Sequence, residues 1–312
     1  MENAFDDIND FLRLSYPADE SILIGCRAES CNSYECCEYD IIVLELDKNE
    51  NDRIFKKTNF DFFQISDKKL KISFCKKDDF VYNKSIDFQT YINLTNSVLK
   101  NSSDNFFKKK IEYSKKNFKI LTKRKLLQFA LDCTNINKIV LKDFSSQSLS
   151  SYYVNMMSFN VLELLIQLFA NKNPSPSHLK YQINTIKEIN SKIKEHVDII
   201  SEYLALDRSN VSTITRSEKS LFFLLNHNKC HKLEIEFFIN KLQYFKKKSM
   251  YVDANLLIHS FLKKENFNTN YIKNYNKLLN YILDIPNKET IIILKELNHL
   301  FNIINNFIKN SY

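Results

Sequence analysis

The sequence contains a single glycine, Gly25, in 312 residues. An average chain carries roughly one glycine in every fourteen residues. Glycine-rich phosphate loops need several glycines, so this chain can form neither the Gly-x-Gly-x-x-Gly loop of dinucleotide-binding proteins nor a P-loop. A chain with one glycine is also expected to keep it where a side chain is not tolerated.

Long apolar runs are missing as well. No run reaches the roughly 18–20 residues that cross a bilayer. The acidic start, Met1 to Asp7, differs from the basic and then apolar layout of a signal peptide. The seven cysteines are an odd number, which fits reduced thiols better than a disulfide framework. We therefore expect a soluble cytoplasmic protein with no membrane partner.

The charge balance permits an anionic partner but does not require one. The net charge is +8 at pH 7, which is compatible with a nucleotide or RNA as partner. Lysines cluster at several places, among them 108–110, 123–125 and 246–248. Such clusters are typical of solvated helix faces, so only a cluster beside a nucleotide site would matter for function.

The first third of the chain combines helical and strand patterns. Helical spacing predicts a helix over 4–15. Contiguous apolar runs predict strands at 21–25 and 39–46, and such runs are typical of strands that are covered on both faces. Further elements are expected as strands at 53–58, 60–65 and 69–75, followed by a mixed helical segment at 86–99.

From about residue 106 onward, apolar residues recur at helical spacing. Expected helices cover 106–133, 150–171, 178–205, 217–226, 231–248, 250–263, 270–284 and 288–310. The pattern predicts an α+β fold in two parts. A small mixed-sheet domain is expected at 1–112, and an all-α helical-bundle domain at 113–312.

The segment around the glycine brings together residue types that bind metal and phosphate. Gly25 ends the apolar run 21–24, and Glu38 follows thirteen residues later, two positions before Asp40 and the apolar run 41–44. Carboxylates at positions i and i+2 of a strand lie on the same face. Both can therefore bind one Mg²⁺, which prefers oxygen ligands.

This segment resembles the signature of the nucleotidyltransferase superfamily, which has a polymerase-β-like fold. The shared features are the apolar strand, the glycine turn, Arg27-Ala28, and the paired carboxylates that open the next strand. A second stretch, 162–179, looks like a helix-loop-helix in the helical domains of minimal and antibiotic-type members. The resemblance implies transfer of a nucleotidyl group from an NTP–Mg²⁺ complex to a hydroxyl of a small molecule, a protein or an RNA end.

The resemblance also implies roles for individual residues. Glu38 and Asp40 would act as catalytic metal ligands together with a third carboxylate, in a site that holds two Mg²⁺ ions. For the third ligand Asp61 is preferred, because it lies within an expected strand, whereas Asp67 and Asp78 fall in expected loops. The residues that would line the triphosphate are Gly25, Cys26 and Arg27.

Several residues depart from the family pattern. Glu38 stands where the family has aspartate, Cys26 stands where serine is usual, and Glu29 adds a negative charge near the expected phosphates. These departures leave two hypotheses for the function. The chain is either an active nucleotidyltransferase or a catalytically degenerate module of the same fold, used for nucleotide sensing or protein interaction. Self-association through the helical domain is a further expectation.

Two other classes of protein share part of this pattern. Four cysteines fall within residues 26–37, but they include no Cys-x-x-Cys pair and no histidine lies near them in the sequence, so a structural zinc site is not favoured. Small reduced residues packed beneath a strand are the favoured interpretation. The other class is a helical interaction protein whose N-terminal β region does not have this fold.

Overall fold

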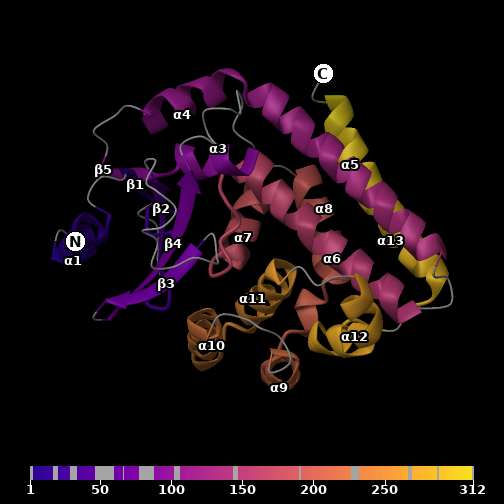
Figure 1. Ribbon diagram of the computed structural model, residues 1–312. Helices are drawn as coiled ribbons and strands as arrows, with labels where there is room; N and C mark the ends of the chain where they lie inside the picture. The colour runs from indigo at the N-terminus through magenta and orange to yellow at the C-terminus, as the bar shows by residue number, and fades with distance from the viewer. Residues whose placement is uncertain are drawn as a thin grey trace. The chain divides into compact units, whose positions relative to one another are not determined.

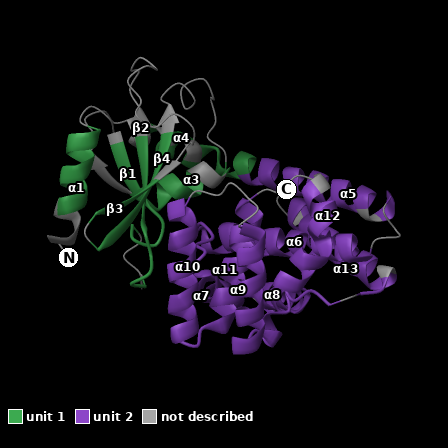
Figure 2. Cartoon of the chain, turned by 60° about the horizontal axis from the view of Figure 1, so that its bottom comes forward, with its two compact units in different colours: residues 1–121 green, residues 122–312 purple. Residues whose placement is uncertain are grey.

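The computed structural model describes residues 3–16, 20–28, 34–45, 60–65, 67–76, 88–101, 106–142, 147–189, 191–225, 232–265, 269–286 and 288–310. The chain forms two compact units, Met1–Leu121 and Thr122–Tyr312 (Figure 2). The first contains a small mixed sheet and the second is helical, which confirms the α+β class. The boundary predicted near residue 112 lies inside helix α4, Phe106–Lys116.

The first unit is built on a five-stranded sheet (Figure 1). The strands are β1 Glu20–Ile24, β2 Tyr39–Glu45, β3 Phe60–Ile65, β4 Lys68–Lys76 and β5 Val98–Asn101, and the helices are α1 Asn3–Ser15, α3 Phe88–Thr95 and α4. Their order in the sheet is β3-β4-β2-β1-β5. β2 and β4 run parallel, and the other pairs are antiparallel. The strand expected at 53–58 lies outside the described residues.

Strand β5 corrects the prediction of a helical segment over 86–99. The helix α3 ends at Thr95, and the chain then pairs with β1, where Val98 faces Leu23. The strand has four residues, which is too few for a recognisable alternation of polar and apolar residues. Pairing with a strand far away in the sequence therefore decides its conformation.

Alternation along the strands divides their side chains between the two faces of the sheet. One face packs against α1 through Leu23, Tyr39, Ile41, Val43, Leu70 and Ile72. On the opposite face, Ile22 and Ile42 are 0% and 7% exposed. The expectation that β1 and β2 are covered on both faces is therefore confirmed. Asp40 lies on this second face, in register with Ile24 of β1.

The second unit is helical, as predicted, although several predicted helices are divided. It continues from α5 Phe118–Lys142 through α6 Gln147–Leu165, a π-helical turn Ile166–Ala170, α7 Leu179–Ile189, α8 Ser191–Tyr203, a short 3-10 turn Leu206–Arg208, α9 Val211–Leu225, α10 Lys232–Lys247, α11 Tyr251–Lys264, α12 Thr269–Ile282 and α13 Thr290–Asn310. The predicted helix 178–205 is interrupted between α7 and α8.

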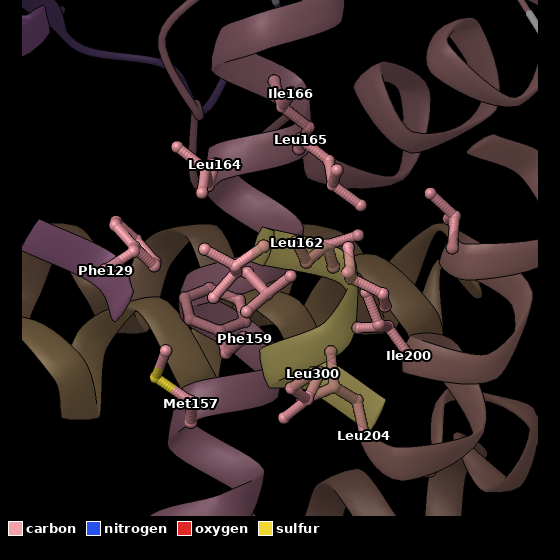
Figure 3. Close-up of a cluster of buried hydrophobic side chains, with 14 of the residues drawn as sticks. Phe129, Met157, Phe159, Leu162, Leu164, Leu165, Ile166, Ile200, Leu204 and Leu300 are labelled. Atoms are coloured by element: carbon pink, nitrogen blue, oxygen red, sulfur yellow. The ribbon is translucent and has the colours of Figure 1, made fainter. Parts of the chain in front are cut away.

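Helix α6 forms the centre of this unit and packs against α8, α11, α12 and α13. Phe159, Leu162 and Leu165 of α6 are fully buried, and they meet Ile200 of α8 and Leu300 of α13 in one apolar cluster (Figure 3). Because α6 is covered on several sides, its residues are apolar around most of the helix. This explains why the segment was recognisable from the sequence.

One helix in the described part of the chain, Gln147–Ala170, is long and apolar enough to cross a membrane by length and composition. The sequence had led us to expect no such segment. In the most apolar window of this helix, 61% of the residues are buried inside the structure. Core helices and membrane-spanning helices are both long and apolar, so length and composition do not distinguish a core helix from a membrane-spanning one.

The lysine clusters were expected on solvated helix faces. Lys109, Lys115 and Lys116 are exposed on α4, and Lys247 and Lys248 are exposed at the end of α10. This expectation is confirmed for those residues.

Candidate functional site

The antiparallel pairing of β1 and β2 brings Gly25 next to Asp40. Ile24, the last residue of β1, is in register with Asp40, and Gly25 follows it directly. The backbone of Gly25 has φ +74°, and a Cβ atom at this position would lie 3.2 Å from Oδ2 of Asp40. A side chain here would be strained in its backbone and crowded by a carboxylate. The expectation that the single glycine stands where a side chain is not tolerated is confirmed.

We predict that Gly25→Ala lowers the free energy of unfolding by about 1–2 kcal/mol, because an L-residue is disfavoured in the left-handed conformation. Urea denaturation followed by circular dichroism would measure the change. Gly25→Asn also adds a Cβ but tolerates this conformation better, so a smaller loss for asparagine would assign the effect to the backbone. Equal stability of Gly25→Ala and the natural protein would contradict the prediction.

The negative charges of Asp40 and Glu38 both act on the thiol of Cys26. The pKa of the Cys26 thiol is raised, first by its hydrogen bond with Cys37, then by burial, and further by the negative charges of Asp40 and Glu38. The structure thus brings together four of the residues that were predicted for the site: Gly25, Cys26, Glu38 and Asp40.

Cys26 and Cys37 form a hydrogen-bonded pair of thiols. Both cysteines are free, Cys37 is buried and Cys26 is half-buried. The raised pKa keeps Cys26 in the neutral thiol form at pH 7, and the neutral form is a poor nucleophile and metal ligand. For these two residues the structure agrees with the expected role of small, reduced, packed residues.

Arg27 connects the turn after β1 with the segment before β2. Its guanidinium donates hydrogen bonds to the backbone oxygens of Tyr34, at 3.2 Å, and Cys37, at 3.0 Å. The guanidinium carbon also lies 4.9 Å from the centre of the Tyr39 ring. Arg27 therefore holds the two sides of the site together. Its role in lining a triphosphate stays a prediction.

After Gly25 the described residues 26–28 form a turn. The N–H of Ala28 donates a 3.0 Å hydrogen bond to the carbonyl oxygen of Gly25. The described residues stop at Ala28 and resume at Tyr34. Glu29, which was expected to bring negative charge toward the phosphates, lies outside them.

The strand neighbours of Asp40 offer no carboxylate at its own level. Asp40 is in register with Ile24 on β1 and with Lys71 on β4. Oδ1 of Asp40 lies 3.6 Å from Nζ of Lys71, and each side chain is 30% exposed. Among the described residues, the ammonium of Lys71 on the neighbouring strand β4 therefore lies beside Asp40.

Of the three aspartates considered as third ligand, the structure describes Asp67 and the backbone of Asp61. Asp61 is on β3 and pairs with Ile72, so β4 separates it from β2. Two strand spacings of about 4.8 Å each lie between the backbones of β3 and β2. The side chain of Asp61 and the whole of Asp78 lie outside the described residues, and Asp67 is exposed beside the β3–β4 turn. The assignment of Asp61 stays a prediction.

Sequence reasoning missed Lys71. The sequence did carry a signal for its orientation, because Lys71 stands between the apolar residues Leu70 and Ile72 and so lies on the other face of the strand. In the structure Leu70 and Ile72 are fully buried. That alternation does not reveal which residue lies opposite on the next strand. The parallel pairing of β2 with β4 joins segments that are distant in the sequence, so only the folded sheet brings Lys71 to Asp40.

Two comparisons with known proteins give no match. No protein-family model matches the sequence, and a search of curated proteins finds no similar one.

Proposed function

We propose that this chain has a nucleotidyltransferase-like fold and transfers a nucleotidyl group from an NTP–Mg²⁺ complex to a hydroxyl acceptor. The acceptor class stays open between a small molecule, a protein and an RNA end. The observation that supports the proposal is the contact between the Gly25 turn and Asp40 at the junction of β1 and β2. A glycine turn lets phosphates approach the backbone, and it lies here directly beside a carboxylate.

The chemistry of the donors fits one Mg²⁺ ion. Glu38 and Asp40 supply carboxylate oxygens, which this hard cation prefers, and both act on the same thiol, that of Cys26. A bound Mg²⁺ ion would supply positive charge to polarise a phosphoryl oxygen. In this proposal Glu38 and Asp40 hold the ion, and Gly25 leaves room for the phosphates.

A second function is supported by a different observation. Asp40 is paired with Lys71, and the guanidinium of Arg27 donates to backbone carbonyls. A site in which one carboxylate is already paired with an ammonium also suits a degenerate module that senses nucleotides or binds another protein. In both proposals Gly25 and Asp40 form the same local structure, so nucleotide binding and transfer must be measured separately.

We predict that NTPs stabilise the protein in a manner that depends on Mg²⁺ and on Asp40. At a ligand concentration of 100 Kd the linkage stabilisation is about 2.7 kcal/mol, which a thermal-shift measurement resolves. Asp40→Asn should keep the fold and lose the Mg²⁺-dependent shift. Asp10→Asn, on the exposed side of α1, is the matched control and should leave the shift unchanged.

The outcomes separate the two functions. A shift that persists in Asp40→Asn would contradict the role of Asp40. No response to any NTP, with or without Mg²⁺, would favour a module that binds a protein. If the shift is present, incubation with an NTP labelled at the α-phosphate, together with RNA or protein acceptors, tests transfer directly. Only the enzyme incorporates the label into an acceptor.

A further inference from the structure

The cation beside Asp40 is part of the protein itself. Lys71 stands in register with Asp40 on the neighbouring parallel strand, and its Nζ lies 3.6 Å from Oδ1. Both side chains are 30% exposed, so the pair is reachable from solvent on one side. In the same register row, the next residue beyond Lys71 is Phe62 of β3, which is 6% exposed and offers no ligand atom.

A second divalent cation at Asp40 would need further oxygen ligands and a free approach. At the level of Asp40 the described strands provide Ile24 on one side and Lys71 on the other. The ammonium repels a doubly charged ion twice as strongly as a singly charged one. The ammonium of Lys71 lies 3.6 Å from Oδ1 of Asp40 and therefore occupies the side of this carboxylate that faces β4.

We infer that Lys71 takes the place of a second metal ion: the site binds one divalent cation per chain, and the Lys71 ammonium binds the phosphate oxygens of the nucleotide. The part of this inference that concerns the nucleotide rests on the proposed function. An ammonium is a compact point charge that commonly binds phosphate. Lys71 therefore has two expected effects of opposite sign, because it weakens metal binding at Asp40 and strengthens nucleotide binding.

The test uses Mn²⁺ as the probe and the full chain. Electron paramagnetic resonance of free Mn²⁺ during titration yields the number of ions bound per chain, and we expect one. Lys71→Gln removes the charge and should bind that ion about tenfold more tightly, while the affinity for ATP in the presence of Mg²⁺ falls about tenfold, as expected for the loss of one nearby charge. A purely structural role would weaken both.

Two further variants keep the test decisive. Lys68→Gln changes a lysine of the same strand on the opposite face of the sheet, where its ammonium lies 2.8 Å from Oδ2 of Asp7, and it should shift both affinities much less because the sheet and the solvent screen this more distant charge. Lys71→Arg keeps the positive charge. If Lys71→Gln does not fold, Lys71→Arg should still bind one Mn²⁺ ion and retain ATP binding.

The number of Mn²⁺ ions bound per chain decides between the possible outcomes. One Mn²⁺ ion per chain, with opposite shifts of the two affinities in Lys71→Gln, supports the inference. Two Mn²⁺ ions per natural chain overturn the inference but leave the proposed nucleotidyl transfer intact. A count of zero overturns both, because no divalent cation would then bind at Glu38 and Asp40. Parallel weakening of Mn²⁺ and ATP binding in Lys71→Gln also overturns the inference.

Discussion

Phe159→Ala is expected to lower the free energy of unfolding of the helical unit by about 3–5 kcal/mol, the range for phenylalanine truncation in a packed core. Phe159 is fully buried at the centre of α6 and belongs to the main apolar cluster (Figure 3). Its ring stacks on that of His259 at 5.5 Å between centroids. Truncation therefore leaves a cavity bordered by rigid helices, which close such a space only in part.

The matched control is Phe223→Ala. Phe223 lies on α9 and is 56% exposed, so its truncation should change stability by no more than about 0.5 kcal/mol. Urea unfolding followed by far-UV circular dichroism measures both variants, because the helical unit dominates the helical signal. Since domains have total stabilities of about 5–15 kcal/mol, a loss below 1 kcal/mol for Phe159→Ala would contradict the central position of this ring.

Acidification from pH 6.5 to 4 is expected to destabilise the helical unit by about 3 kcal/mol through His259 alone. This side chain is 0% exposed, and burial lowers its pKa from 6.5 to about 4, against the opposing effect of its hydrogen bond with the backbone oxygen of Asn255. Below pH 6.5 the unfolded chain takes up a proton at this residue and the folded chain does not. Stability therefore rises with pH between about 4 and 6.5 and levels off above.

The pH effect is isolated by comparison with His259→Gln, which keeps polar atoms near Asn155 and Asn255 but does not titrate. Burial and the charge of His299 lower the pKa of His196, so His196 also makes the protein less stable as the pH falls. Burial raises the pKa of Glu163 and of Glu296, so these two residues make the protein more stable as the pH falls. These contributions are common to both proteins. The difference in unfolding free energy between pH 6.5 and 4 should therefore shrink by about 3 kcal/mol in the variant. Identical pH profiles would show that His259 is protonated without cost in the folded state.

Local pattern was sufficient for much of the fold. The predicted helix at 4–15 and the predicted strands at 21–25, 39–46, 60–65 and 69–75 all appear in the structure within one or two residues. These elements have strong local signals, since β1 and β2 are apolar on both faces and α1 has one apolar stripe. The strand β5 had no such signal, because its four residues take their conformation from pairing with β1.

Some residues of the candidate site were likewise predictable from the sequence, and others were not. Gly25 and Asp40 were recognisable because they lie beside two successive strands, and an antiparallel pair brings those ends together. Lys71 was not recognisable, because its strand joins β2 in parallel and a parallel pair requires a long connection. The side chain of Arg27 could not be assigned from the sequence either, since its acceptors, the backbone oxygens of Tyr34 and Cys37, come into reach only when the two segments fold together.

The sequence by itself determined the α+β class, the place of the single glycine and the presence of paired carboxylates at the start of the second strand. These properties follow from composition and from periodicity within short segments, which fold under local constraints. Only the tertiary structure decided that the ammonium of Lys71 lies beside the carboxylate of Asp40. The reason is that sheet order and register depend on burial over the whole unit, and a shift of one residue would move Lys71 to the opposite face.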